Sequence, residues 1–76
     1  MDTALIMFTV YNPWTLDFPG QWVVRRFRVS AGRFVPEAEA WHVGPSLEGA
    51  RASIPQGYVQ LCRDADDDPV IHEIWV

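Results

Sequence analysis

The segment Asp64–Val76, which reads D-A-D-D-D-P-V-I-H-E-I-W-V, is the stretch around which the chain is organised. An acidic loop leads into Pro69, and the β-branched and aromatic residues that follow predict a strand over Val70–Val76. Glu73 shares a face of this strand with Trp75, because side chains alternate along a strand. We expect this last strand to lie in the core of a sheet.

The residues before the loop predict a hairpin that ends in this strand. Tyr58–Arg63 is the expected partner strand. The connection Asp64–Pro69 has six residues. It suits an antiparallel hairpin, since a parallel crossover needs about a dozen residues or more.

A short helix is expected over Leu47–Ile54. Pro45 ends the strand before it, and Ser46 is a suitable N-cap, because its hydroxyl accepts a hydrogen bond from the first turn. Glu48 near the start and Arg51 near the end match the helix dipole. So short a helix is stable only when it leans on the sheet.

The segment Gln21–Val43 predicts a second hairpin, with Gly32 in its turn. Its strands are Gln21–Ser30 and Phe34–Val43, and Pro36 within the second predicts an edge position or a bulge. The face of the first strand expected in the core carries Val23, Arg25, Phe27 and Val29, and the other face carries Trp22, Val24, Arg26 and Arg28. On the returning strand, we expect Glu37 and Glu39 to lie opposite Arg26 and Arg28 and to pair with them.

The N-terminal residues predict the remaining strand, Ala4–Tyr11, which Asn12-Pro13 ends. Trp14–Gly20 then forms a loop. The order of elements is β-β-β-α-β-β, which is typical of the α+β class. We expect a small antiparallel sheet with one short helix packed on one face, in a single domain of residues 1–76.

Composition limits the class of protein. The chain has 76 residues, of which 49% are hydrophobic, so it forms one domain with a small core. Cys62 is the only cysteine, which excludes a secreted scaffold built on intrachain disulfides. The apolar run Ala4–Phe8 is too short for the core of a signal peptide or for a membrane span. We therefore expect a cytoplasmic protein that has no membrane association.

The acidic loop is the first candidate for chemistry. Asp64, Asp66 and Asp68 alternate as they do at the start of a calcium loop. A calcium loop also needs a glycine at its sixth position and a glutamate at its twelfth, where this chain has Pro69 and Trp75. The pattern therefore favours a solvated turn.

Other catalytic and metal-binding patterns are also incomplete. His42, His72 and Cys62 do not have the spacing of a zinc signature. The sequence contains neither a nucleophile elbow nor a glycine-rich phosphate cradle. The sequence predicts no metal, no cofactor and no enzyme activity.

Several short motifs recur together in the chain. Ser46–Val76 contains a Leu-Glu-x-x-Arg helix, a Pro-x-Gly turn and an Asp-Asp-Pro-x-Ile-x-Glu-x-Trp ending, and Tyr11-Asn12-Pro13 and Asp17-Phe18-Pro19 fit the same pattern. With these motifs the chain resembles a family of short uncharacterised bacterial proteins. The resemblance implies a bacterial protein of unknown function, and it carries over no functional residue.

The tryptophan content suggests what such a protein does. The chain has four tryptophans, more than one short helix can cover, and large apolar patches rarely stay exposed. We predict a small non-catalytic interaction module that acts by self-association, as a homodimer, or by docking on another protein. The candidate interaction surface consists of Trp22, Arg26, Arg28, Trp41 and Trp75.

An alternative function uses the arginine cluster to bind nucleic acid or another anion. The cluster consists of Arg25, Arg26, Arg28 and Arg33. The net charge of −4 argues against a general nucleic-acid binder, because neutralisation of phosphates supplies most of the affinity of such proteins.

The position of the last strand leads to a prediction about stability. Removal of Trp75 and Val76 should lower the melting temperature sharply, because these residues belong to the expected core strand. Thermal unfolding of the shortened chain, followed by circular dichroism, measures the effect. An unchanged melting temperature would place the strand at the periphery.

Overall fold

The computed structural model describes residues 5–61 and 68–76, and it shows a six-stranded antiparallel sheet with one short helix against it. The elements are β1 (Leu5–Tyr11), β2 (Trp22–Ser30), β3 (Arg33–Pro36), β4 (His42–Gly44), α1 (Leu47–Ala52), β5 (Gln60–Leu61) and β6 (Ile71–Trp75). The α+β class expected from the sequence is confirmed.

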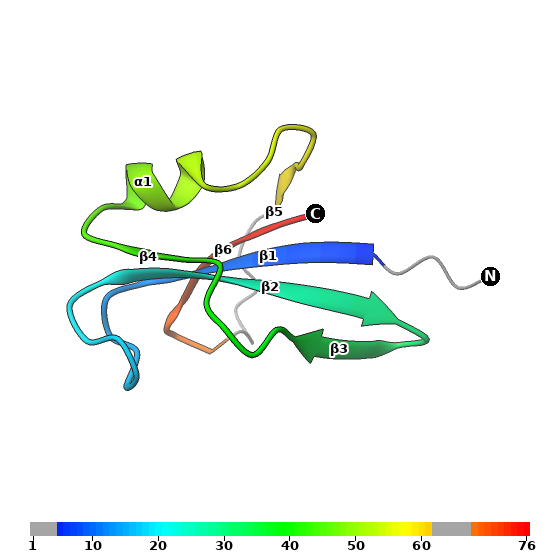
Figure 1. Ribbon diagram of the computed structural model, residues 1–76, viewed down its shortest axis with the longest axis horizontal. Coiled ribbons are helices and arrows are strands. Elements are labelled where there is room, and N and C mark those ends of the chain that lie inside the picture. The colour runs from blue at the N-terminus through cyan, green and yellow to red at the C-terminus, as the bar shows by residue number, and fades with distance from the viewer. Residues whose placement is uncertain (1–4, 62–67) are drawn as a thin grey trace.

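The sheet places the last strand beside the first. The strand order is β3-β2-β1-β6-β5, and β4 also pairs with β2. In Figure 1, β6 (red) runs along β1 (blue), and α1 lies over one side of the sheet. The expectation that the last strand is internal is confirmed, because β6 has a hydrogen-bonded neighbour on each side.

The strand expected over Phe34–Val43 is broken in two, which corrects the sequence-based order of elements. Its two parts, β3 and β4, pair with opposite ends of β2. Between them the backbone leaves the ladder, although Glu37 still donates to the Arg26 carbonyl at 3.0 Å and Trp41 to the Val24 carbonyl at 2.8 Å. The break follows Pro36, which has no N–H to continue a ladder.

The strand before the acidic loop begins later than the sequence suggested. Within the described residues, Gln60–Leu61 pairs as β5, and Val59 adds two backbone hydrogen bonds with Val76, of 2.7 and 2.9 Å. The helix is shorter than expected, since Ser53 serves as its C-cap. Ala4, Cys62, Arg63 and the first part of the acidic loop lie outside the described residues.

The core cluster beneath the helix lies on the opposite face of β2 from the one expected, although Val23 on the expected face is buried as well. The buried cluster is Phe8, Val10, Val24 and Ala50, and Ile6, Trp22, Leu47, Ile54, Tyr58 and Trp75 pack against it. Val24 therefore points toward α1, and Val29 lies on the other face. The arginines misled the prediction, because Arg26 lies beside Trp41 and Glu37 at the margin of the core.

The helix comes close to the sheet through small residues. Ala50 is fully buried against the sheet, and the Ser46 side chain caps the helix by accepting a hydrogen bond from Gly49 N at 3.1 Å. The imidazole of His42 fills the space beside Gly44 and Gly49, and a Cβ built on Gly44 would lie 2.8 Å from His42 Nε2. A side chain at position 44 therefore has no room.

This contact predicts that Gly44→Ala lowers the free energy of unfolding by about 1–3 kcal/mol, the usual cost of overpacking. Urea unfolding of the single variants and of the double variant Gly44→Ala/His42→Ala measures the coupling. In the His42→Ala background the added methyl group should cost little. An equal loss in both backgrounds would mean that the imidazole is not the obstacle.

Candidate functional site

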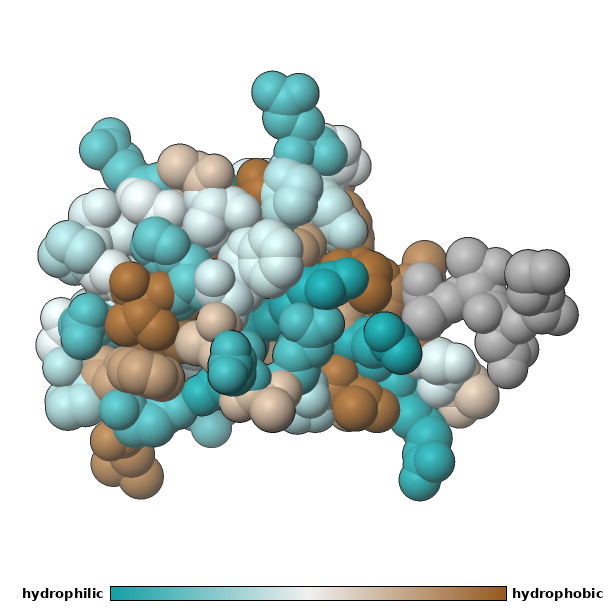
Figure 2. Space-filling model, viewed as in Figure 1, coloured by the Kyte–Doolittle hydropathy of each residue, from teal (hydrophilic) through white to brown (hydrophobic). Residues whose placement is uncertain are grey.

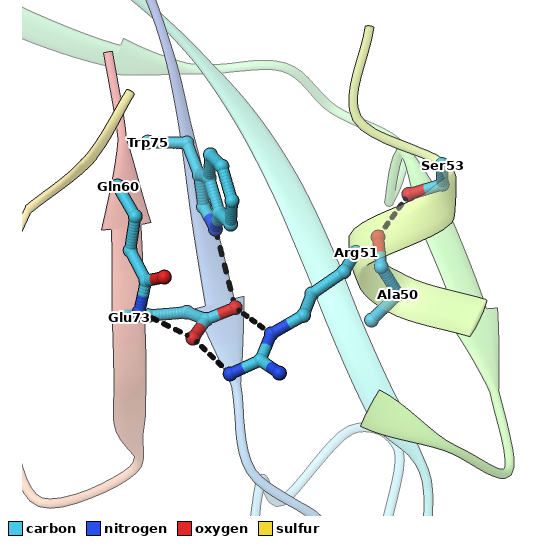
Figure 3. Close-up of polar contacts among 6 residues, drawn as sticks. All are labelled: Ala50, Arg51, Ser53, Gln60, Glu73 and Trp75. Atoms are coloured by element: carbon cyan, nitrogen blue, oxygen red, sulfur yellow. Dashed lines mark hydrogen bonds and ion pairs between the residues drawn. The ribbon is translucent and has the colours of Figure 1, made fainter. Parts of the chain in front are cut away.

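A buried carboxylate on β6 gathers the strongest polar contacts of the described chain. The side chain of Glu73 is 3% exposed. The Arg51 side chain on α1 donates two hydrogen bonds to it, from Nε to Oε1 at 2.8 Å and from Nη2 to Oε2 at 2.9 Å. Figure 3 shows that this pair joins the helix to the sheet. Such a bidentate ion pair is stronger than a single hydrogen bond between neutral groups.

Two more donors complete the surroundings of this carboxylate. Gln60 Nε2 on β5 donates to Oε2 at 2.8 Å, and the Trp75 indole donates to Oε1 at 3.2 Å (Figure 3). The hydrogen bonds from Arg51 lower the pKa of Glu73, against the opposing effect of burial. The carboxylate is therefore ionised at neutral pH and saturated with donors, which suits a structural role and not proton transfer.

The residues of the candidate interaction surface lie largely on the side of the sheet that carries α1. Trp22 and Trp75 pack against the core cluster, so they are not a free surface. Trp41 packs edge-on against Phe8, with ring centroids 5.2 Å apart, and its indole donates to the Ser53 carbonyl at 2.9 Å. Much of the tryptophan surplus seen in the sequence is thus used within the fold.

The arginines do not form one cluster. Arg25 lies on the face away from α1 and forms an ion pair with Asp17. Arg26 pairs with Glu37 at 2.9 Å, as the sequence suggested, and its guanidinium lies 5.6 Å from the centroid of the Trp41 ring. Arg28 is exposed and lies opposite Val35 and not opposite Glu39, the partner expected from the sequence. Glu39 lies in the segment between β3 and β4.

The two histidines lie apart from any metal-binding group. The ring of His72 packs edge-on against Trp22, with centroids 5.0 Å apart, and His42 lies under the helix. Among residues 5–61 and 68–76, no three His, Cys, Asp or Glu side chains are placed to hold a metal ion. Asp68, the described end of the acidic loop, accepts a hydrogen bond from Val70 N at 3.1 Å, as in an Asp-initiated turn.

The face of the sheet away from α1 carries a group of apolar side chains that we call the open face. The strand register brings them together: Leu5 lies opposite Val29, Met7 opposite Phe27, Phe34 opposite Val29, and Leu61 opposite Ile74. Val59 and Val76 join them through their hydrogen-bonded pair. The open face thus consists of Leu5, Met7, Phe27, Val29, Phe34, Val59, Leu61, Ile74 and Val76.

Much of this face is accessible. The exposed fractions are 69% for Leu5, 62% for Phe34, 63% for Val59, 45% for Leu61 and 46% for Val76. Figure 1 shows that the single helix of the described chain covers only the other side. In the view of Figure 2 the apolar side chains form small groups divided by hydrophilic ones. On the open face the strand register brings apolar residues together on β1, β2 and β3 and on β5 and β6. The buried Thr9, which lies opposite Ile74, stands where β1 meets β6.

A pocket of about 330 Å³ lies at one end of this face. It is lined by Tyr11, Trp14, Thr15, Leu16, Asp17, Arg25, Asp68 and Val70. Burial raises the pKa of the Tyr11 hydroxyl, so this group stays protonated at neutral pH. The charge of Arg25 is already matched by Asp17, and the side chains of Trp14 and Leu16 are exposed at this site. Besides this ion pair, the lining of the pocket contains one further charged residue, Asp68.

Of the residues that the sequence placed in the core on this face of β2, Val23 is confirmed, since it is 1% exposed. Phe27 and Val29 belong instead to the open face. Both faces of β2 carry apolar residues, so the sequence alone does not decide which of them faces the helix.

A scan against protein-family models, a search of curated proteins and a search of solved structures found no match to this chain. Within the described residues, no helix has the length and apolar character needed to cross a membrane.

The Glu73 contacts predict a stability difference that depends on pH. Glu73→Gln should lower the free energy of unfolding at pH 7 by about 1–3 kcal/mol, because it weakens charged hydrogen bonds in a buried place. A carboxyl whose pKa is lowered by folding stabilises the fold above its ordinary value of 4.5. That contribution is lost as the pH falls through the lower pKa of the folded state.

Urea unfolding at about pH 7 and about pH 3 tests this expectation, and the difference between the wild type and Glu73→Gln should shrink at the lower pH. Glu39→Gln is the control, because the Glu39 side chain is exposed. An equal loss at both pH values would show that the charge of Glu73 does not contribute.

Proposed function

We propose that this protein is a small, non-catalytic interaction module whose working surface is the open face of its sheet. The observation that carries the proposal is the set of apolar side chains on Leu5, Phe34, Val59 and Leu61, all of them on the side without a helix and all at least 45% exposed. Single exposed apolar residues are ordinary on protein surfaces, whereas a connected group marks an interaction site.

The size of the open face supports the same proposal. Five of its members are 45–69% exposed, so its accessible area is on the order of several hundred Å², as for the largest patch of a typical monomer. A standard interface takes about 800 Å² from each partner. The open face and the residues around it are therefore large enough for a specific contact.

The surface first suggested by the sequence has a smaller part in this proposal. Trp22 and Trp75 contribute to the core beneath α1, and Arg26 is held by Glu37. Arg28 and part of Trp41 stay exposed on the helix side and form a separate polar margin.

Binding of nucleic acid or another anion by the arginines is the less favoured function. Alternation places Arg25 and Arg26 on opposite faces, and each already pairs with a carboxylate. A surface that binds phosphates needs several unmatched cations on one side.

We also propose that the protein is bacterial and lies in the cytoplasm. The single cysteine excludes an intrachain disulfide, which is consistent with a bacterial cytoplasm, where thiols stay reduced. The resemblance to short bacterial proteins points the same way.

A photoreactive amino acid placed in β3 tests the proposed surface. Phe34 and Val35 are neighbours and both exposed, but Phe34 belongs to the open face and Val35 lies opposite Arg28 on the helix side. We expect p-benzoylphenylalanine at position 34, in cells of the source organism, to form a covalent adduct with a protein, and the same probe at position 35 to form little. No adduct from position 34, or equal adducts from both positions, would contradict the proposal.

A further inference from the structure

We infer that the partner of the open face is a second copy of this chain, packed sheet to sheet about a two-fold axis. This inference rests on the proposed function, because it names the occupant of the same surface. Three properties of the described residues support a second copy: the apolar character of the nine members of the face, its area, and the small size of the core behind it.

The composition of the open face matches an interface between identical chains. Its nine members are all apolar, and Arg25, a charged residue on the same side of the sheet, is already paired with Asp17. Interfaces of homodimers are more apolar than those of transient complexes, and their centres are depleted in charge. A two-fold axis packs one surface against an identical copy of itself, so an apolar surface avoids repulsion between like charges.

The area of the open face also fits such a pair. Two copies of a surface of several hundred Å² bury on the order of 1,000 Å² in total, which is near the lower bound for a specific interface. Flanking residues add to this area when two sheets pack about 10 Å apart. Met7 and Phe27 are half-buried on the adjacent strands β1 and β2, so they lie within the sheet and not at its edge.

The core of the single chain is small. The buried hydrophobic residues of the described chain are Phe8, Val10, Val23, Val24 and Ala50. A domain of this size has marginal stability, and association is a common way to bury more apolar surface. A second copy covers the face that the single short helix leaves open.

A different protein as occupant is less favoured by the same observations. Selection of one foreign partner usually relies on a pattern of charges or polar groups that rejects the others. The open face has no such pattern in its described members, whereas a second copy is present at equal concentration wherever the chain is made. The pocket beside Tyr11 does not indicate a competing ligand, because Arg25 in its lining is already paired with Asp17.

Sedimentation equilibrium of the full chain over a wide concentration range tests the inference. The variants are Phe34→Glu and Leu5→Glu on the open face, with Val35→Glu as the matched control on the same exposed strand. We expect the wild type to form dimers, and each open-face variant to raise the dissociation constant on the order of 100-fold, since it buries two unpaired charges. The control should change it by less than about threefold.

Circular dichroism shows that each variant is folded, and the two open-face positions provide independent readings should one variant fold poorly. A wild type that stays monomeric at every concentration would overturn the second-copy inference. A dimer that Phe34→Glu and Leu5→Glu leave intact, or that Val35→Glu weakens equally, would overturn it as well. The proposed function fails separately, when the photoreactive probe at position 34 forms no adduct with any protein.

Discussion

The paired carboxylate of Glu73 is the interaction on which the arrangement of the fold depends. A buried negative charge must be matched, and here Arg51 comes from the helix while Gln60 and Trp75 come from the sheet. The helix is held on the side where Glu73 points. Because side chains alternate along β6, the same choice commits Ile74 to the opposite side.

This constraint links stability to the proposed function. One helix of six residues can cover only one side of a six-stranded sheet, and Glu73 selects that side. The apolar residues that remain on the other side, among them Leu5, Phe34 and Leu61, are then available for a partner. The features that make the single domain small therefore also leave the apolar side that we propose as its interaction surface.

Several local features follow directly from the sequence. The Ser46 cap, the strand at the chain's end and the pairing of Arg26 with Glu37 each depend on residues whose spacing is visible in the sequence. These are local rules of capping, alternation and cross-strand charge, which a short window of residues can express. Pro36 was expected to disturb its strand, and the strand in fact ends there.

The features that depend on residues far apart in the chain could not be predicted from the sequence. The position of β6 beside β1 joins residues more than sixty positions apart, and no local pattern specifies such a pairing. The covered side of β2 was misassigned because Val23 and Val24 are equally apolar, and both turn out to be buried. The role of Glu73 was also missed, since in the sequence it appears as one more acidic residue beside the aspartates.

The central claim is that the fold leaves one side of its sheet open for a second copy. Methyl NMR with a soluble paramagnetic agent, recorded at increasing protein concentration, measures it most directly. The account predicts that the methyl groups of Leu5, Val59 and Leu61 are attenuated in dilute samples and become protected as the concentration rises. The methyl groups of Val10 and Val24, which are fully buried, should stay protected throughout. Protection of Leu5, Val59 and Leu61 at every dilution, in a chain that sediments as a monomer, would show that the protein covers this face itself and would contradict the account.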